Sequence, residues 1–333
     1  MRLRVFTCGL LVLGLSLMGG ITARATFHGT NGRITFARFI PENNGFEVFS
    51  IRADGSDEKQ LTFDPPGRTS YFSDWSPDGS RIAIDSDRNG DGVDIFTMKP
   101  DGSDIVQLTS HIGFNGEPEY SPDGTKIAFE SDRGLGFPLQ GIYFMNASDG
   151  SDVQRVSFPS DKELDTDPHF SPDGKRVAFT RLRNCFLRFK ENGRYPRPKG
   201  CIGAVLVANL DGSEMKRLTQ WGMDTGGFDW SPDGSRIAYT IGIDPHPGSQ
   251  SDILIANADG SHPVNLTNNG PLSAKCPVQL AFRPKWSPDG TKFVFMHYDC
   301  EGGGLWLMNV DGSNKHPLTN KFEEKPDWGT NQE

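Results

Sequence analysis

Long apolar runs are absent from this 333-residue chain beyond its first 25 residues, so no later segment is long enough to span a membrane. Basic residues are not in excess either. The chain has 34 Lys and Arg against 43 Asp and Glu, which excludes a whole-protein basic footprint for nucleic acid. It has no Gly-x-Ser-x-Gly elbow, no Rossmann fingerprint and no zinc-type histidine spacing. Common enzyme interpretations are therefore weak.

The first 25 residues are typical of a secretory signal peptide. Arg2 and Arg4 give a positive start, and Val5–Met18 is apolar. Ala23-Arg24-Ala25 matches a cleavage site, so the mature chain should begin near Thr26. The alternative is an uncleaved membrane anchor, but the apolar run is short for a span. We expect an exported protein, periplasmic or extracellular, with no stable membrane insertion after cleavage.

What the chain does contain is a repeated phrase, Ser-Pro-Asp-Gly, which occurs five times and begins at Ser76, Ser121, Ser171, Ser231 and Ser287. An aromatic residue precedes every copy: Trp75, Tyr120, Phe170, Trp230 and Trp286. Apolar alternation follows each copy. Pro, Asp and Gly in this order suit a tight turn, so each phrase should join two strands.

A second phrase, Asp-Gly-Ser, occurs six times and begins at Asp54, Asp101, Asp149, Asp211, Asp259 and Asp311. An apolar strand precedes each copy, and an apolar residue followed by Thr or Ser comes after it at a fixed spacing. The repeating unit is therefore four strands, here called A to D. Four strands in roughly 45 residues form a β-propeller blade.

The two ends of the chain carry the halves of a split repeat. Asn31–Phe36 matches the back half of the turn phrase with strand B, and Lys325–Gly329 matches the front half with strand A. These halves predict an all-β, six-bladed β-propeller that is closed by pairing of the N- and C-terminal strands in one blade. Residues 26–333 should form this single domain after a signal peptide at residues 1–25.

The repeated pattern Trp-Ser-Pro-Asp-Gly, Ile-Ala-Phe, Ser-Asp-Arg, Asp-Gly-Ser and Leu-Thr resembles the propeller repeats of the TolB-like family. The resemblance covers essentially the whole mature chain and implies a six-bladed propeller. TolB itself carries an α/β domain before its propeller. That domain is missing from this sequence, so the resemblance does not imply the transport role of TolB.

Two connections break the repeat, and both should lie on the face of the disc that carries the B–C and D–A loops. One is the B–C loop Leu182–Ile202, and the other is the D–A connection from Thr267 to Ser287. Four cysteines lie in or beside these long connections or in the loop that follows them. The fifth cysteine, Cys8, is removed with the signal peptide. An exported chain with the remaining four cysteines predicts two disulfides, and we expect Cys185–Cys201 and Cys276–Cys300, with four free thiols as the alternative.

The long B–C loop combines basic and aromatic side chains: Arg183, Phe186, Arg188, Phe189, Arg194, Tyr195 and Arg197. Arginine in such a loop could hold a carboxylate or phosphate group. The alternative is a solvated hairpin whose charges keep it soluble. The loop therefore suggests a protein partner or an anionic envelope or extracellular polymer.

Two further groups are candidate ligand sites. Inner-strand residues should line a central channel as a polar ring: Glu117, Glu119, Asp167, His169, Asp229, Arg283 and Lys285. Such a ring could bind a cation, water or a small polar ligand, or it could only hydrogen-bond neighbouring blades. The segment with Asp85, Asp87, Asn89 and Asp91 matches half of a calcium loop, although Phe96 replaces the expected bidentate Glu. An ordinary B–C turn is the favoured interpretation there, so no cofactor is expected unless that loop binds Ca²⁺.

These observations favour an exported binding or scaffold propeller without catalytic activity, whose ligand contacts the B–C/D–A loop face. The second hypothesis is a propeller enzyme, a polysaccharide lyase or hydrolase, with its site at the channel mouth. His169 with Asp167 and Glu117 would be its candidate residues.

Overall fold

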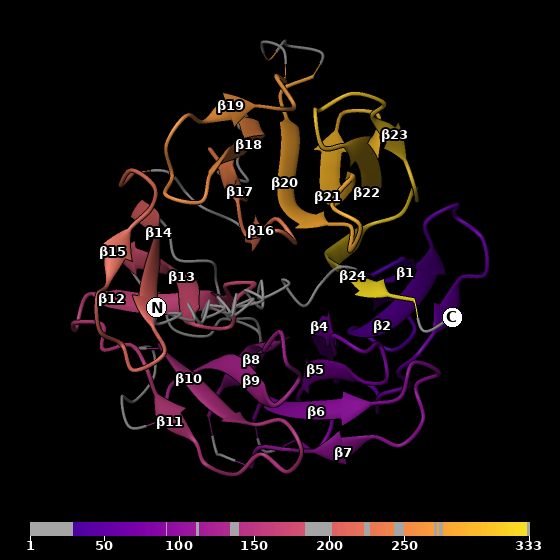
Figure 1. Cartoon of the computed structure of the whole chain (residues 1–333). Coiled ribbons are helices and arrows are strands. Elements are labelled where there is room, and N and C mark those ends of the chain that lie inside the picture. The colour runs from indigo at the N-terminus through magenta and orange to yellow at the C-terminus, as the bar shows by residue number, and fades with distance from the viewer. Residues whose placement is uncertain are drawn as a thin grey trace, which may run out of the picture.

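The computed structural model of the chain describes residues 29–90, 92–110, 113–133, 140–183, 202–222, 227–242, 250–269, 272 and 276–331. These residues form strands and turns, and none of them belongs to a helix that could cross a membrane. The sheets stand around a common centre like the blades of a propeller (Figure 1). The predicted all-β fold is confirmed.

Each group of four strands comes from one continuous stretch of the sequence, except the first, in which β24 joins β1, β2 and β3. The first sheet has the order β24 (Glu323–Thr330), β1 (Asn31–Ile40), β2 (Gly45–Arg52) and β3 (Lys59–Gln60). The next contains β4 (Ser70–Trp75), β5 (Ile82–Ser86), β6 (Asp94–Met98) and β7 (Val106–Gln107). It is followed by β8 (Asn115–Tyr120), β9 (Lys126–Ser131), β10 (Gly141–Asn146) and β11 (Gln154–Arg155).

The second half of the chain repeats this arrangement. One sheet contains β12 (Glu163–Phe170), β13 (Arg176–Arg183), β14 (Ile202–Asn209) and β15 (Lys216–Arg217). The following group contains β16 (Phe228–Trp230), β17 (Arg236–Ile241), β18 (Gln250–Asn257) and β19 (Val264–Asn265). The last contains β20 (Gln279–Trp286), β21 (Lys292–Asp299), β22 (Gly302–Asn309) and β23 (His316–Pro317). A short parallel pairing of β18 with β20 joins these two groups into one sheet.

The two ends of the described chain meet in one sheet. Strand β1 pairs antiparallel with β24, with Ile34 opposite Trp328 and Arg38 opposite Glu323. The split repeat at the chain ends is the sequence cause, because each half lacks the strand that the other provides. The pairing covers the inner edge of β1, which would otherwise expose unpaired backbone groups.

The Ser-Pro-Asp-Gly turns are held by side chains as well as by backbone geometry. In the first copy the Gly79 N–H donates to the Ser76 carbonyl at 2.7 Å, and Gly79 has a φ of 65°. The Ser76 hydroxyl donates to Asp78 at 2.7 Å and accepts from the Arg81 N–H at 2.8 Å. Serine and aspartate are therefore needed for these hydrogen bonds in addition to the turn conformation.

The hydrophobic core lies between blades. The six clusters of buried apolar residues each combine strands from two neighbouring blades, so every blade packs on both faces. Each cluster contains one of the aromatic residues that end the inner strands: Trp75, Tyr120, Phe170, Trp230, Trp286 and Trp328. These rings are 2–6% exposed. Their recurrence in the sequence therefore reflects packing between blades.

One of the two predicted disulfides lies within the described residues. Cys276 and Cys300 are bonded, and their Cα atoms are 5.2 Å apart. The bond ties the long connection before β20 to the turn between β21 and β22. Cys185 and Cys201 lie outside the described residues.

Truncation of Trp328 tests how strongly the core depends on the chain end. We expect Trp328→Ala to lower the free energy of unfolding by about 3–5 kcal/mol, because it leaves a cavity between two blades. Urea denaturation measures the loss. Phe63→Ala is the control, since Phe63 is 74% exposed and its truncation should cost about 0.5 kcal/mol or less. Equal losses in the two variants would contradict the packing role of Trp328.

Candidate functional site

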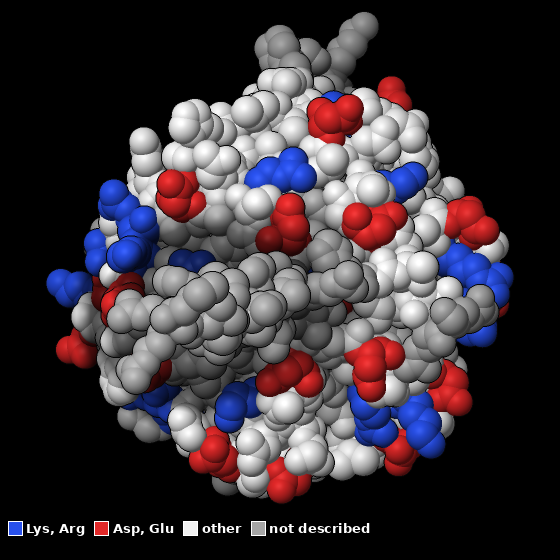
Figure 2. Space-filling model, viewed as in Figure 1, with Lys and Arg blue, Asp and Glu red and all other residues white. Residues whose placement is uncertain are grey.

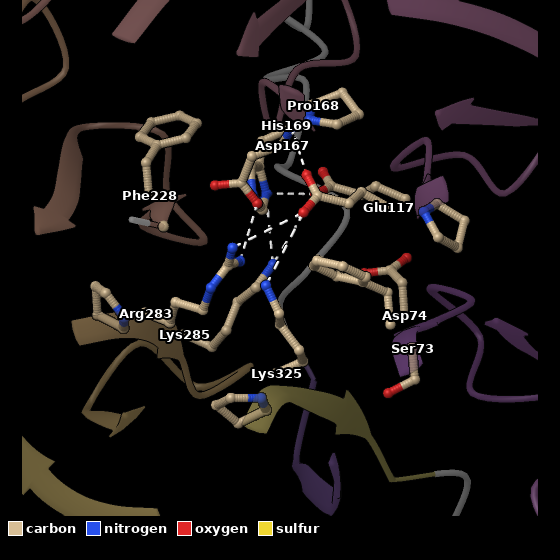
Figure 3. Close-up of a pocket in the computed structure, with 16 residues that line it drawn as sticks. Ser73, Asp74, Glu117, Asp167, Pro168, His169, Phe228, Arg283, Lys285 and Lys325 are labelled. Carbon is tan, nitrogen blue, oxygen red and sulfur yellow. Dashed lines mark hydrogen bonds and ion pairs between the residues drawn. The ribbon is translucent and has the colours of Figure 1, made fainter. Parts of the chain in front are cut away.

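The central pocket is lined by all six inner strands or the residues next to them. Its cavity has a volume of about 40 Å³, and its walls come from β4, β8, β12, β20, β24 and the start of β16. Figure 3 shows charged side chains from several blades converging on this space. The structure thus brings together six of the seven channel residues that the sequence predicts: Glu117, Glu119, Asp167, His169, Arg283 and Lys285. The seventh, Asp229, is not among the residues that line this pocket.

Four charged residues at this pocket have a left-handed backbone conformation. Their φ angles are 49° for Glu117, 55° for Asp167, 53° for Arg283 and 56° for Lys325. Each precedes a proline, and a register shift interrupts the pairing of its strand at this place. Such backbone costs about 1–3 kcal/mol per residue and is concentrated at functional sites. We call these four residues the charged ring.

The ion pairs of the charged ring are long. Arg283 Nη1 lies 3.4 Å from Asp167 Oδ1, and Arg283 Nη2 lies 3.8 Å from Glu117 Oε1. Lys325 Nζ lies 4.0 Å from Glu117 Oε1. Charge-assisted hydrogen bonds have lengths of about 2.7–2.9 Å, so these pairs leave space between the charges. The buried Oδ2 atom of Asp167 has no hydrogen-bond partner.

An aromatic side chain occupies the corresponding position of β4. Lys325 Nζ lies 4.0 Å from the centre of the Phe72 ring, and the Arg283 guanidinium lies 5.3 Å from it. A ring face attracts a nearby cation, so Phe72 supports both basic side chains on one side of the pocket. On the other side, Gly227 permits the close approach of Arg283, because a Cβ atom there would lie 2.6 Å from Arg283 Cγ.

A second layer of carboxylates lies two residues further along the inner strands, towards the Ser-Pro-Asp-Gly turns. We call these the latch carboxylates: Asp74, Glu119, Asp229 and Asp327. Each accepts a hydrogen bond from the backbone N–H of the aromatic residue in the next blade. The acceptor–donor pairs are Asp74 with Tyr120 at 2.7 Å, Glu119 with Phe170 at 2.8 Å, Asp229 with Trp286 at 2.7 Å and Asp327 with Trp75 at 3.0 Å. These four acids therefore join neighbouring blades by hydrogen bonds, which is one of the two roles that the sequence suggested for the polar channel residues.

His169 and Lys285 replace the carboxylate in the two remaining blades. Lys285 Nζ lies 4.0 Å from Glu119, 3.9 Å from Asp327 and 3.4 Å from His169 Nδ1. His169 contacts Glu119 directly, and its Nε2 lies 3.6 Å from Asp167. Burial opposes the charged imidazolium, but the carboxylates outweigh it and raise the pKa of His169 to about 10. Both residues are therefore cations that offset part of the negative charge of the four latch carboxylates.

Two buried acids stand behind the charged ring, on the strands next to it. Asp85 accepts hydrogen bonds from the backbone N–H groups of Phe72 at 2.8 Å and Glu117 at 3.1 Å. Burial raises its pKa to about 7 in spite of these bonds. Glu130 is also buried, its Oε2 has no hydrogen-bond partner, and burial raises its pKa well above the ordinary value.

Sequence reasoning missed the place of these two acids. It considered Asp85 only as part of an ordinary B–C turn or of half a calcium loop, and it did not single out Glu130. The available signal was an acid at a buried position of strand B, where the other blades have Thr180, Thr240, Met296 and Ala37.

The members of the half calcium loop make separate contacts. Asp85 bonds the inner strands as described, and Asp87 Oδ1 accepts from the Thr69 N–H at 2.6 Å. Asn89 donates to Gln107 at 2.8 Å. Asp91 lies outside the described residues. Among the residues that the structure describes, no group of three or more His, Cys, Asp or Glu side chains is arranged to hold a metal ion.

The basic–aromatic loop is described only at its base. Phe186, Arg188, Phe189, Arg194, Tyr195 and Arg197 lie outside the described residues. Arg183 bonds to Glu163, and its guanidinium lies 3.7 Å from the centre of the Trp221 ring. Trp221 did not stand out in the sequence, because it follows strand D at a position where the repeat varies.

Replacement of Asp85 tests its burial through the pH dependence of stability. The pKa of Asp85 in the folded state lies above the ordinary value of 3.8. The stability that Asp85 contributes is therefore fully present below about pH 4, and it is lost as the pH rises towards 7. In Asp85→Asn the decline of the free energy of unfolding from about pH 4 to about pH 8 should be smaller by about 2–4 kcal/mol. Urea denaturation at both pH values measures it. The exposed Asp161→Asn should follow the unmodified protein, and an identical decline in Asp85→Asn would contradict the assignment.

Comparisons with known proteins agree with this architecture. A family model described as the TolB beta propeller domain matches residues 25–192. A 76-residue stretch is 29% identical to the Tol-Pal system protein TolB of Xylella fastidiosa (strain M12). The match covers 23% of this chain and only 16% of the length of that relative.

Solved structures share the fold at low sequence identity. TolB from Acinetobacter baumannii aligns with a TM-score of 0.67 and 22% identity over 90% of this chain and 67% of its own. An oligogalacturonate lyase in complex with manganese aligns with a TM-score of 0.54 and 14% identity over 87% of this chain and 74% of its own. At these identities the structures show the fold alone. The matched residues 25–192 are half of the chain, and the chain therefore belongs to the family of TolB beta propeller domains.

Proposed function

We propose that this chain is an exported binding module without catalytic activity, and that a protein partner contacts the face that carries the D–A connections. Antiparallel strands alternate in direction, so the B–C and D–A connections of every blade meet on one face, opposite the Ser-Pro-Asp-Gly turns. Export is the expectation from residues 1–25, and the propeller supplies the rigid scaffold on which such loops commonly bind.

The observation that carries the proposal is the position of the exposed aromatic side chains. Phe63, Phe158 and Phe322 are 74%, 67% and 55% exposed, and each follows strand D of its blade. They are the most exposed phenylalanines within the described residues. Aromatic residues and arginine are enriched at protein interfaces, and Arg155 lies 4.3 Å from the centre of the Phe158 ring. Trp221 with Arg183 continues the same pattern in the next blade.

The charge distribution favours a protein over an anionic polymer. On the face shown in Figure 2, Lys and Arg side chains are interspersed with Asp and Glu, and neither sign forms a continuous field over the described residues. An anionic polymer would be held by a surface of mainly positive charge. The polymer hypothesis depends on the loop between β13 and β14, which lies outside the described residues.

The alternative of a lyase or hydrolase depends on His169. A histidine must be neutral to bind a metal or to accept a proton. With a pKa of about 10, His169 is protonated near neutral pH and is held by Glu119 and Asp167. This argues for the binding module and against a catalytic centre built on His169.

Replacement of the exposed rings tests the proposed face. Proteins retained from an envelope extract by the immobilised unmodified chain are identified and then quantified for the double variant Phe63→Ser/Phe158→Ser. Two anchors worth about 1–2 kcal/mol each should reduce retention of the specific partner at least about tenfold.

The control pair is Val106→Ser/Val264→Ser, which are 43% and 57% exposed on β7 and β19 at the outer edges of two blades. It should retain the partner fully. Unchanged retention by the phenylalanine variant, or an equal loss in the control, would place the interface elsewhere.

A further inference from the structure

A second cavity opens on the Ser-Pro-Asp-Gly face, between the blade of β4–β7 and the blade of β8–β11, which are neighbours in Figure 1. Its volume is about 680 Å³. Pockets of about 300–1,000 Å³ take ligands of drug size, so this cavity has room for more than a single ion. Its walls are formed by the turns that begin at Ser76 and Ser121 and by the C–D turn Asn146–Ser148.

The C–D turn at this cavity departs from the repeat. In five of the six Asp-Gly-Ser turns, the glycine N–H donates to the carbonyl three residues earlier, as Gly260 does to Asn257 at 2.8 Å. Gly150 instead donates to Asn146, four residues earlier, at 2.9 Å. The extra residue is Ser148, and it lines the cavity. The otherwise regular Ser-Pro-Asp-Gly face therefore changes its structure at the wall of this cavity.

Tyr120 lines the same cavity at a position where the other blades have Trp or Phe. The residue is 4% exposed. The corresponding indole N–H groups of Trp75, Trp230 and Trp286 are fully buried without a partner. The Tyr120 hydroxyl is not enclosed in this way, and it makes no hydrogen bond with the described residues. The cavity therefore holds a hydroxyl that can donate to a ligand or accept from it.

Asp123 supplies a negative charge at the cavity wall. Its Oδ1 atom accepts from the Ser121 hydroxyl at 2.6 Å and from the Thr125 N–H at 3.0 Å. Burial would raise the pKa of Asp123, but these hydrogen bonds outweigh burial and hold the pKa below its ordinary value. Asp123 is therefore ionised at neutral pH. Within the described residues it has no ion-pair partner, and its Oδ2 atom accepts no hydrogen bond.

The other charges at the cavity leave it acidic. Asp78 adds a second carboxylate to the lining. Arg81 is the one basic residue among the described residues that line the cavity, and its guanidinium is already bound to Asp104 at 2.7 Å and to Thr97 at 2.9 Å. A cationic ligand therefore complements the cavity better than a neutral or anionic one.

We propose that this cavity binds a lysine or arginine side chain that a polypeptide partner presents on a short exposed segment. The cationic group donates to Asp123 Oδ2, and the Tyr120 hydroxyl bonds a peptide group of the segment. Pro77, Pro122 and Ala147 offer apolar surface to the aliphatic stem of the basic side chain. A metal ion would use only the carboxylates and would leave this apolar surface and the hydroxyl without contact.

This site goes beyond the proposed interface and is independent of it. Phe63 and Phe158 do not line the cavity, and they lie on connections at the opposite face. Loss of partner retention in the phenylalanine variant therefore leaves binding of a basic segment unaffected. Absence of binding at this cavity likewise leaves the proposed interface untouched.

Calorimetric titration of the full chain with acetyl-Gly-Lys-Gly-amide and acetyl-Gly-Arg-Gly-amide tests the proposal. We expect single-site binding of at least one of them with a dissociation constant below about 10 mM. Acetyl-Gly-Gln-Gly-amide keeps the peptide groups without the charge, and n-butylamine keeps the charge and stem without the peptide groups. Each should bind at least about fivefold more weakly than the basic peptide.

Two variants locate the bound groups. Asp123→Asn should weaken binding of the basic peptide at least about fivefold. Asp173→Asn is the matched control, because Asp173 accepts the same turn hydrogen bonds from Ser171 at 2.6 Å and Lys175 at 3.1 Å but does not line the cavity. It should bind like the unmodified chain.

Tyr120→Phe removes only the hydroxyl and should weaken binding about threefold or more. Phe170 occupies the corresponding position in the next blade, so the ring should still pack. Thermal melting establishes that each variant is folded.

Four results would overturn the proposal. The first is no binding of either basic peptide up to about 10 mM. The second is equal affinity for the Gln peptide. The third is full affinity in a folded Asp123→Asn or Tyr120→Phe variant, or an equal loss in Asp173→Asn. The fourth is tighter binding of a neutral sugar, maltose, which would make the cavity a carbohydrate site.

Discussion

The burial of charge at the centre of the ring is the constraint on which the rest of the structure depends. Acidic and basic side chains from the six inner strands surround a cavity of about 40 Å³. A buried charge without a partner would be far more costly there than in water. The latch carboxylates meet this constraint with backbone N–H donors from the next blade. Lys285 and His169 supply the opposite charge. Each contact joins two blades, so electrostatic balance and ring assembly are the same set of interactions.

In the charged ring, which lies nearer the loop face than the latch carboxylates, the buried charges are less completely compensated. The charged ring sits on strained backbone with long ion pairs and an acceptor oxygen that has no partner. The contrast between the two layers separates their roles. The lower layer is closed by hydrogen bonds of 2.7–3.0 Å between neighbouring blades, whereas the ion pairs of the charged ring are 3.4–4.0 Å long.

Much of the fold could be predicted from the sequence because the repeat specifies local contacts. The turn phrases place the strands, and the aromatic residues before them mark one core cluster for each pair of blades. The split repeat at Asn31–Phe36 and Lys325–Gly329 indicates the β1–β24 pairing. The pairing of Cys276 with Cys300 follows in the same way, because both flank connections that the repeat places on one face.

The candidate site shows how far this reasoning extends. The order of residues along the chain determines which side chains enter the channel and which face the variable connections occupy, since both follow from strand alternation and repeat spacing. The distances across the channel depend on side chains from blades far apart in the sequence, such as Asp167 and Arg283 at 3.4 Å. Left-handed φ at Glu117, the orphan oxygen of Asp167 and the buried Glu130 likewise arise only when the closed ring brings six strands together. Local sequence therefore fixes the blades, and ring closure creates the electrostatic environment of the pocket.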